Sequence, residues 1–473
     1  MPWVTWADSM TMRDTDHGIR PDAPRAVALN FLTWVRRQAW LQPIYRIAPE
    51  SMRLRLADLL KSRSAARLRF PRTEAWSRPL AAPEPVVRVA SAAAAGGPGL
   101  DIHGFIRGQF GLGESARLYS RALLAAGCDV ALHDVDLGLP HGWDDHSLDA
   151  FMRDASVHPF SIVFVNPDCF DQALDHIGRE RLSGKFIIGC WFWELERIPD
   201  AWLGAVDQVD AIMVASAFIE DAFRRVTDKP ILRVPIPLSP VSDSGLQRQD
   251  FGLDEGCFTF LTSFDFNSAT ARKNPLAAIA AFRAAFPAAR QDVRLVVKSS
   301  NGHRYDHAMR DLLQAAASDP RIILRDEVID RAHVHALQRC CDAYVSLHRA
   351  EGFGLGLAEC MALGKPVIAT GWSGNLEFMD EHNACLVDYT LVPVAEGEYP
   401  DSAGASWAEV DLHAAAAAMR KLADAPRLAE DIGRRGQQDV RRRLAPAGAA
   451  DAFITQLAAI GPLRGHIAGG LAQ

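Results

Sequence analysis

From residue 100 onward, short apolar runs alternate with amphipathic helical patterns. Apolar runs of this length are typical of buried strands, and apolar positions three and four residues apart are typical of helices. In the first half we predict strands at residues 100–106, 129–135, 161–166, 185–194, 211–216 and 231–237, and helices at 114–126 and 217–226. In the second half we predict strands at 258–266, 293–299, 322–326, 342–347 and 367–370, and helices at 275–286, 305–317, 331–340, 357–363, 412–423, 427–444 and 446–460. Such alternation predicts an α/β protein with parallel sheets covered on both faces.

Two stretches divide the chain. Residues 79–99 are rich in Ala, Pro and Gly, and residues 239–252 are rich in Ser, Asp, Gln and Gly. Both compositions are typical of linkers. We therefore predict a helical extension with its linker (1–97), a first Rossmann-like domain (98–240), a second one (250–445) and a helical tail (446–473). Open α/β sheets bind ligands at the carboxyl ends of their strands, so two sheets predict two half-sites, one for each substrate.

The front of the chain is basic. Residues 1–90 contain 15 Lys and Arg against 8 Asp and Glu, whereas the rest contains 36 against 50. Residues 51–70 mix Leu with Arg, a pattern that fits a helix on an anionic membrane surface. A solvated helical arm packed on the body fits equally well, and both interpretations stay open. The net charge of −7 argues against general nucleic-acid binding.

Composition is that of an ordinary globular protein, with 49% hydrophobic and 23% charged residues among 473. The eight cysteines form no C-x-x-C pair, which favours reduced thiols in the cytoplasm. We find neither a signal-peptide pattern at the start nor an apolar run of about 18 residues. These features predict a cytoplasmic protein, with peripheral contact at the inner face of the membrane left open.

The segment 348–359 carries the most specific chemistry. Glu351 and Glu359 lie eight positions apart with three glycines between them, after a predicted strand and before the helix predicted at 357–363. Glycines at a strand-to-helix turn let backbone N–H groups approach an anion. Glu359 falls in the first predicted helical turn, where the helix dipole favours an ionised carboxylate. A carboxylate can accept two hydrogen bonds from a diol, so the segment suits a ligand with hydroxyls and phosphates, such as a nucleotide sugar.

This segment, with its continuation at residues 360–369, resembles the E-x7-E motif of GT-B glycosyltransferases of family 4, the retaining glycosyl transferases group 1. The resemblance covers about residues 100–445 and implies two Rossmann-like domains facing across a cleft. It implies that Glu351 contacts hydroxyls of the donor sugar and that Glu359 holds the ribose hydroxyls. The amides of the residues between them would face the donor diphosphate, namely Gly352, Phe353, Gly354 and Leu355.

Residues 263–275 form a second element of the resemblance. The family places an Arg and a Lys here on the donor diphosphate, which corresponds to Arg272 and Lys273. The family spacing is usually wider than the adjacency seen here, so Lys273 fits better than Arg272. Cations suit this place because the leaving nucleoside diphosphate gains negative charge as the glycosidic bond breaks. A solvated basic pair on a loop is the alternative.

Two further segments are less specific. The glycine loop at 108–114 would bring Gly111 and Gly113 towards the diphosphate and the acceptor, or it forms only a tight turn. Many family members carry a His at the end of the strand predicted at 185–194, but this chain has none there, so Glu194 or Trp193 would take its place. Exposed aromatic rings at that strand end could stack on a sugar. The alternative is a core aromatic cluster beside a surface acid.

Other polar residues are weaker candidates for the site. His103 and His348 are also candidates, although a lone His beside an apolar strand is more often structural. Asp134 and Asp136 match the D-x-D metal site of the other main glycosyltransferase fold, but paired acids at a strand end are common. No other spacing indicates a metal, so we predict neither a metal nor a cofactor.

Taken with the resemblance, the sequence predicts a metal-independent, retaining hexosyltransferase. It would use a nucleoside-diphosphate sugar and a glycan or lipid-linked acceptor, in bacterial surface-polysaccharide synthesis. The catalytic candidates are Glu351, Lys273, Arg272 and Glu194. A sugar-nucleotide epimerase or a phosphorylase on the same scaffold is an alternative, although no segment points to a pyridoxal-phosphate lysine. A non-catalytic scaffold that binds nucleotide sugar is another, and the donor base, the sugar and the acceptor stay open.

Overall fold

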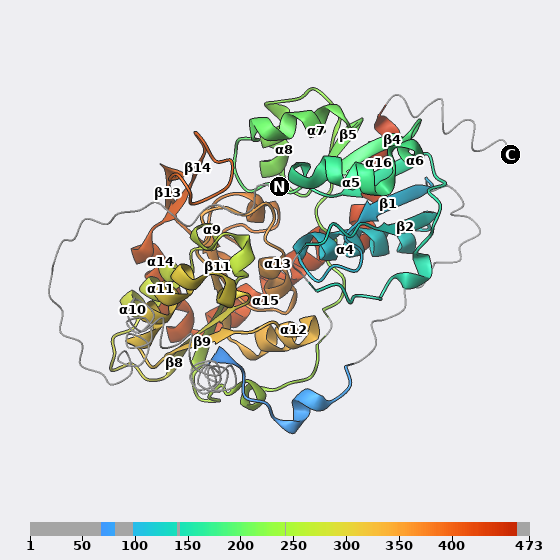
Figure 1. Cartoon of the computed structure of the whole chain (residues 1–473). Helices are drawn as coiled ribbons and strands as arrows, with labels where there is room; N and C mark the ends of the chain where they lie inside the picture. Colours follow the sequence, from blue (N-terminus) through green and yellow to red (C-terminus); the bar gives the residue numbers. More distant parts are fainter. Residues whose placement is uncertain (1–67, 81–97, 140–141, 242, 461–473) are drawn as a thin grey trace, which may run out of the picture. The chain divides into compact units, whose positions relative to one another are not determined.

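We describe a computed structural model of the chain (Figure 1). It describes residues 68–80, 98–139, 142–241 and 243–460, which belong to one compact unit that starts at residue 67. Within this unit, two six-stranded parallel sheets follow each other along the chain. Most of the predicted helical extension, including most of the segment 51–70, and most of the 79–99 linker lie outside the described residues.

The first sheet has the strand order β2-β1-β3-β4-β5-β6. Its strands are β1 (Leu100–Gly104), β2 (Val130–Asp134), β3 (Phe160–Phe164), β4 (Phe186–Cys190), β5 (Ala211–Val214) and β6 (Ile231–Arg233). The helices between them are α4 (Gly111–Ala125), α5 (Phe170–Ile177), α6 (Arg179–Leu182), α7 (Leu203–Asp207) and α8 (Ala217–Arg224). Every residue of β1, β3 and β5 is buried, as expected for parallel strands with helices on both faces.

The second sheet has the order β12-β11-β10-β7-β8-β9. Its strands are β7 (Phe258–Ser263), β8 (Val293–Ser299), β9 (Ile322–Asp326), β10 (Ala343–Ser346), β11 (Val367–Thr370) and β12 (Cys385–Val387). The helices of this half are α9 (Thr270–Lys273), α10 (Pro275–Ala285), α11 (Asp306–Ala317), α12 (Arg331–Cys340), α13 (Leu355–Ala362), α14 (Leu412–Asp424) and α15 (Pro426–Arg443). The strand order reverses between β7 and β10, and open sheets of this kind bind ligands at such a switch point.

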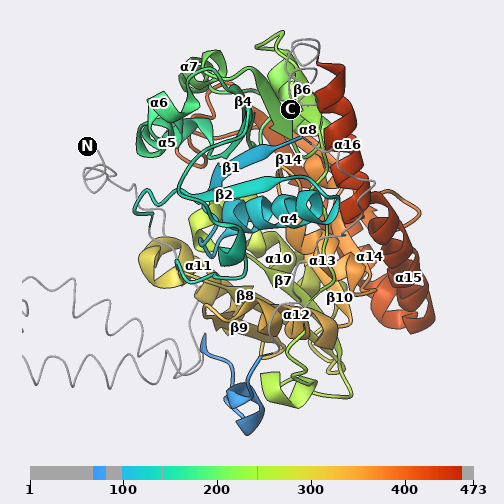
Figure 2. The same ribbon diagram turned by 90° about the vertical axis from the view of Figure 1, so that its right-hand side faces the viewer.

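Strand β12 was not predicted, and three further features departed from the predicted plan. A two-stranded antiparallel hairpin, β13 (Tyr389–Pro393) and β14 (Ser406–Val410), stands between β12 and α14 and was not predicted. Helix α16 (Pro446–Ala459) packs against α4 and β6 of the first half, so this part of the predicted tail joins the first domain (Figure 2). The predicted linker contains the 3₁₀ helix η5 (Arg248–Phe251) and runs beside α12, where the Ser244 amide donates to the Ala332 carbonyl at 3.1 Å.

Residues 68–80 lie against the second half, although the first half follows them in sequence (Figure 1). The Trp76 ring of the 3₁₀ helix η1 (Glu74–Ser77) packs on Phe251 at a centroid distance of 5.4 Å, and its indole N–H donates to the Asp250 carbonyl at 2.9 Å. Phe70 is buried in the same cluster, and its amide donates to the carboxylate of Glu327 at 3.1 Å. These described residues of the predicted extension therefore form an arm on the β9–α12 side of the second sheet.

The remaining short 3₁₀ helices are η2 (Asp149–Phe151), η3 (Pro167–Cys169), η4 (Asp200–Trp202), η6 (Phe266–Ser268), η7 (Gly302–Arg304) and η8 (Gly374–Glu377). All eight cysteines are free thiols. Among the helices of the described ranges, none combines the length and the apolar character needed to cross a bilayer.

Candidate active site

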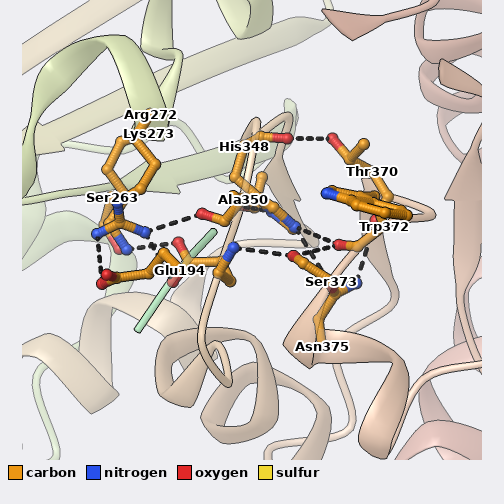
Figure 3. Close-up of polar contacts among 12 residues, drawn as sticks. Glu194, Ser263, Arg272, Lys273, His348, Ala350, Thr370, Trp372, Ser373 and Asn375 are labelled. Carbon is orange, nitrogen blue, oxygen red and sulfur yellow. Dashed lines mark hydrogen bonds and ion pairs between the residues drawn. The ribbon is translucent and has the colours of Figure 1, made fainter. Parts of the chain in front are cut away.

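The four predicted catalytic residues lie together (Figure 3). Glu351, in the loop after β10, stands between the two cations of the short helix α9. Lys273 Nζ lies 2.5 Å from one carboxylate oxygen of Glu351, and Arg272 Nη1 lies 3.2 Å from the other. The adjacency of the two cations, unlike the wider family spacing, therefore still lets both reach one carboxylate. They meet at the β7/β10 switch point, as sheet topology predicts for a ligand site.

The two cations differ in their exposure and in the number of partners that hold them. The Arg272 side chain is only 5% exposed, and its guanidinium also lies 3.3 Å from Glu194 and donates to the Ala350 carbonyl at 2.9 Å. The Lys273 side chain is 22% exposed. Burial lowers the pKa of Lys273, with Glu351 acting against it, whereas Glu194 and Glu351 outweigh burial and raise the pKa of Arg272. Arg272 is thus fixed among anions, and Lys273 is the cation with access to a ligand.

Glu194 joins the site from the first half. It lies in the loop after β4, between Arg272 and the Tyr399 hydroxyl, which donates to its other oxygen at 2.5 Å. Tyr399 belongs to the loop of the β13–β14 hairpin, and Ser406 on β14 donates its amide to Glu196 at 2.8 Å. Tyr399 was not predicted, because the apolar pattern of the sequence gives no signal for the hairpin. Glu194 is therefore a bridging carboxylate between the halves and not a solvated surface acid.

The loop under Glu351 is held by a buried polar network (Figure 3). The Glu351 amide donates to the Ser373 hydroxyl at 2.8 Å. His348 is fully buried and contacts the Asn375 amide oxygen at 3.1 Å and the Ser346 hydroxyl at 3.0 Å. Burial lowers the pKa of His348, which favours a neutral ring. His348 therefore shapes the loop that presents Glu351.

The three glycines between Glu351 and Glu359 have different surroundings. A Cβ on Gly352 would lie 2.9 Å from the Trp193 carbonyl of the first half, so only glycine allows that approach. Gly354 has φ +91° and caps α13, a conformation that side chains rarely adopt. A Cβ on Gly356 would meet only the Tyr344 hydroxyl at 3.6 Å, an ordinary contact. The close approach at Gly352 is thus to another peptide, and the approach of these amides to an anion stays a prediction.

The other predicted donor-binding residues also have distinct surroundings. Phe353 is buried against Phe378, so only its backbone can face a ligand, and Leu355 begins α13. Helix α4 begins at Gly111, where a Cβ would meet nothing within 4 Å. A Cβ on Gly113 would lie 2.3 Å from the Gly108 carbonyl, so Gly113 serves packing of the turn.

Glu359 stands in a second polar cluster, on α13. It pairs with Arg331, and Gln338 Nε2 and His335 Nε2 lie 3.5 and 3.7 Å from its carboxylate. Arg331 Nη2 also lies 3.3 Å from Glu114 on α4, so this cluster too joins the two halves. The prediction that Glu359 sits in the first helical turn was wrong, because α13 begins at Leu355 and Glu359 is its fifth residue. Side-chain cations, and not the helix dipole, favour its ionised form.

The two Trp rings after β4 are not available for stacking on a sugar. Trp191 is fully buried, and Trp193 is 5% exposed and packs on Trp202 at a centroid distance of 4.7 Å. The Trp193 indole N–H donates to the Arg197 carbonyl at 2.6 Å. The idea that exposed Trp rings occupy this strand end was wrong, since the hairpin loop covers Trp193 through Tyr399.

The remaining candidates lie elsewhere. Asp134 accepts hydrogen bonds from the Arg107 amide and the Trp143 indole, and Asp136 accepts from the Gly138 amide. His103 is buried and stacks on His133 at a centroid distance of 4.5 Å, beside Asp101. The Lys185 ammonium lies 2.6 Å from Asp101, which opposes a cation at that cluster.

The two motif carboxylates predict an acid-sensitive site. Burial alone would raise the pKa of Glu351 and Glu359, but Lys273 and Arg272 beside Glu351, and Arg331 beside Glu359, outweigh it and lower both to about 2 from the ordinary value of 4.5. A carboxyl with a lowered folded-state pKa contributes stability above its unfolded pKa, and that contribution is lost as pH falls from 4.5 to about 2. Urea unfolding at pH 6, 4 and 3 should show this loss. In the Glu351→Gln/Glu359→Gln variant the decline should be shallower, and parallel curves would contradict the assignment.

One family model matches the part of the chain that contains most of these site residues. Residues 268–396 match the family model of the glycosyl transferases group 1. The match covers 129 of the 473 residues. It contains Arg272, Lys273, Glu351 and Glu359, which are the residues brought together in the two clusters. No curated protein sequence matches the chain significantly.

Solved structures share the fold at low sequence identity. Sucrose-phosphate synthase from Thermosynechococcus elongatus is 17% identical with a TM-score of 0.55, and the match covers 76% of this chain and 99% of that one. HepE from Anabaena, in complex with UDP and glucose, is 12% identical with a TM-score of 0.54, covering 77% and 100%. The pneumococcal O-GlcNAc transferase GtfA is 15% identical with a TM-score of 0.45, and the match covers 66% of this chain and only 57% of that one. The two better matches confirm the predicted GT-B architecture of two Rossmann-like domains.

Proposed function

We propose that the protein is a retaining glycosyltransferase that moves a hexose from a nucleoside-diphosphate sugar to a hydroxyl of a glycan or lipid-linked acceptor. The observation that carries this proposal is the Lys273–Glu351–Arg272 cluster at the switch point of the second sheet. It lies inside the segment that matches the glycosyl transferases group 1, which supports transferase activity. Bacterial surface-polysaccharide synthesis is the setting that the sequence resemblance suggests.

In the proposed reaction, each residue of the site has its own role. Arg272 keeps Glu351 ionised, and Glu351 accepts hydrogen bonds from hydroxyls of the donor sugar. Lys273 leaves Glu351 for the diphosphate, where it stabilises the negative charge that grows as the glycosidic bond breaks. Glu359 accepts hydrogen bonds from the ribose diol, and the first amides of α13 face the phosphates. Metal ions have no assigned part in this scheme.

Retention follows in this scheme from attack on the leaving-group face. The acceptor hydroxyl forms a new bond to the anomeric carbon as the bond to the diphosphate oxygen breaks. A phosphate oxygen takes the proton that the acceptor loses. Glu194 lies close to Arg272 and Glu351, where the family places its histidine, and we assign it to the sugar or the acceptor hydroxyl.

The test uses the purified full chain with UDP-glucose, UDP-galactose and GDP-mannose. UDP-glucose comes first because HepE, which shares the fold, was solved with UDP and glucose. We expect one donor to be consumed faster when a lipid-linked or glycan acceptor is present, with an α-linked product by NMR and unchanged turnover in EDTA. Donor interconversion without nucleotide release would support the epimerase instead. Binding without consumption, and wild-type polymer formation in cells carrying Glu351→Ala, would support the scaffold.

A further inference from the structure

Lys298 is a buried cation that the scheme above does not use. It is the sixth residue of β8, at the carboxyl edge of the second sheet, and the residue is only 9% exposed. Among the described residues, no hydrogen bond or ion pair within 4 Å reaches its ammonium group. Its ammonium nitrogen is not among the fully buried polar atoms that lack a partner, so it is open to a ligand at the carboxyl edge of the sheet.

The three nearest carboxylates are already engaged. Asp265, Asp326 and Glu327 act on Lys298 only at longer range. Asp265 accepts from the Asn301 side chain at 2.9 Å, and Asp326 accepts from the Ser299 hydroxyl at 2.8 Å. Glu327 holds the amide of Phe70 and pairs with Arg72. Burial lowers the pKa of Lys298 despite these acids. Its ammonium therefore still lacks a direct acceptor.

Strand geometry places Lys298 on the ligand side of the sheet. Side chains alternate along β8, so Lys298 shares the side of Val296 and not that of Val297. Val296 packs in the core cluster that contains residues of α12 and α13, whereas Val297 packs with α10 and α11. Those two helices on the Val296 side carry Arg331 and Glu359. Lys298 is also the register partner of Ser263 on β7, the strand that leads to Lys273.

We propose that Lys298 binds the nucleoside half of the donor nucleotide, through an acceptor oxygen or nitrogen of its base or ribose. The inference rests on the proposed function. Lys273 follows β7, beside the switch point, and takes the diphosphate. Lys298 lies one strand farther from β10, which is the direction in which the nucleoside extends if the sugar lies at Glu351. A bound acceptor would supply the partner that the ammonium lacks.

The test compares Lys298→Met with Lys185→Met in the full chain. Lys185, whose side chain is 12% exposed, is fully paired, with Asp101, Ser156 and the His158 carbonyl all within 2.8 Å. Calorimetry first measures which of UDP, GDP, dTDP and ADP binds the unmodified protein. We expect Lys298→Met to weaken that nucleotide and the matching monophosphate at least about tenfold. Binding of inorganic pyrophosphate should not change.

Thermal unfolding without nucleotide gives the second measurement. Lys298→Met should melt no lower than the unmodified protein, because no hydrogen bond or ion pair of its ammonium group is lost. Lys185→Met should melt lower and keep its nucleotide affinity, because it leaves Asp101 without its cation. Unchanged nucleotide affinity in Lys298→Met overturns the inference and leaves the proposed function standing. Equal losses for pyrophosphate and nucleotide would instead place Lys298 on the phosphates, and an unmodified protein that binds no nucleotide overturns both proposals.

Discussion

Replacing Lys273 by methionine is expected to lower turnover about a hundred- to a thousandfold, the range seen when one group that stabilises transition-state charge is removed. The structure gives the physical reason. Lys273 is the more exposed of the two cations on Glu351, at 22% against 5% for Arg272, so it is the one that can move to a departing diphosphate. Methionine keeps the apolar stem of the side chain and removes the charge. Glu351 stays paired through Arg272, so we expect little loss of stability.

Steady-state transfer with the donor identified by the screen measures this effect, with circular dichroism as the check on folding. Lys365→Met is the matched control. Lys365 lies between the end of α13 and the start of β11, at the amino end of the strand and away from the carboxyl edge where the site lies. It should retain normal turnover. A Lys273→Met enzyme within about threefold of normal turnover would contradict the role given to this ammonium.

Replacing Arg272 by methionine is expected to act mainly on stability, with a loss of about 3 kcal/mol in the free energy of unfolding. Removing one partner of a buried ion pair typically costs about 3–5 kcal/mol because the other charge is left uncompensated. Here the buried guanidinium serves Glu351, Glu194 and the Ala350 carbonyl at once. We expect the lower end of the range, since Glu351 keeps Lys273.

Urea unfolding of Arg272→Met gives this free energy. The matched experiment places the same substitution in a Glu194→Gln/Glu351→Gln background, where no carboxylate is left without its cation. The cost of Arg272→Met should shrink there by at least about 1 kcal/mol, as coupling between residues in contact predicts. A cost below about 1 kcal/mol in both backgrounds would show that Arg272 is not the fixed counter-ion of this site. Lys273 and Arg272 are adjacent in sequence, yet the two substitutions should separate activity from stability.

The fold was predictable because buried strands recur along the chain as apolar runs. Parallel strands covered on both faces must be continuous apolar runs, and each of the eleven runs predicted from residue 100 onward contains a strand in the structure. The E-x7-E segment was predictable for a related reason, since a glycine turn between a strand and a helix leaves a mark in the sequence. The hairpin β13–β14 left no such mark because no residue of β13 is buried, with Leu391 51% exposed.

The sequence by itself determined the two sheets, the glycine turn and which acids and cations are candidates for the site. Each of these depends on neighbours within one strand–turn–helix unit. Only the tertiary structure decided which partner each charge has. Lys273 reaches Glu351 across 78 residues, Tyr399 reaches Glu194 across 205, and Arg331 joins Glu359 to Glu114 of the other half. Partners so distant in sequence meet only when two sheets pack, and the local pattern of either residue carries no record of that packing.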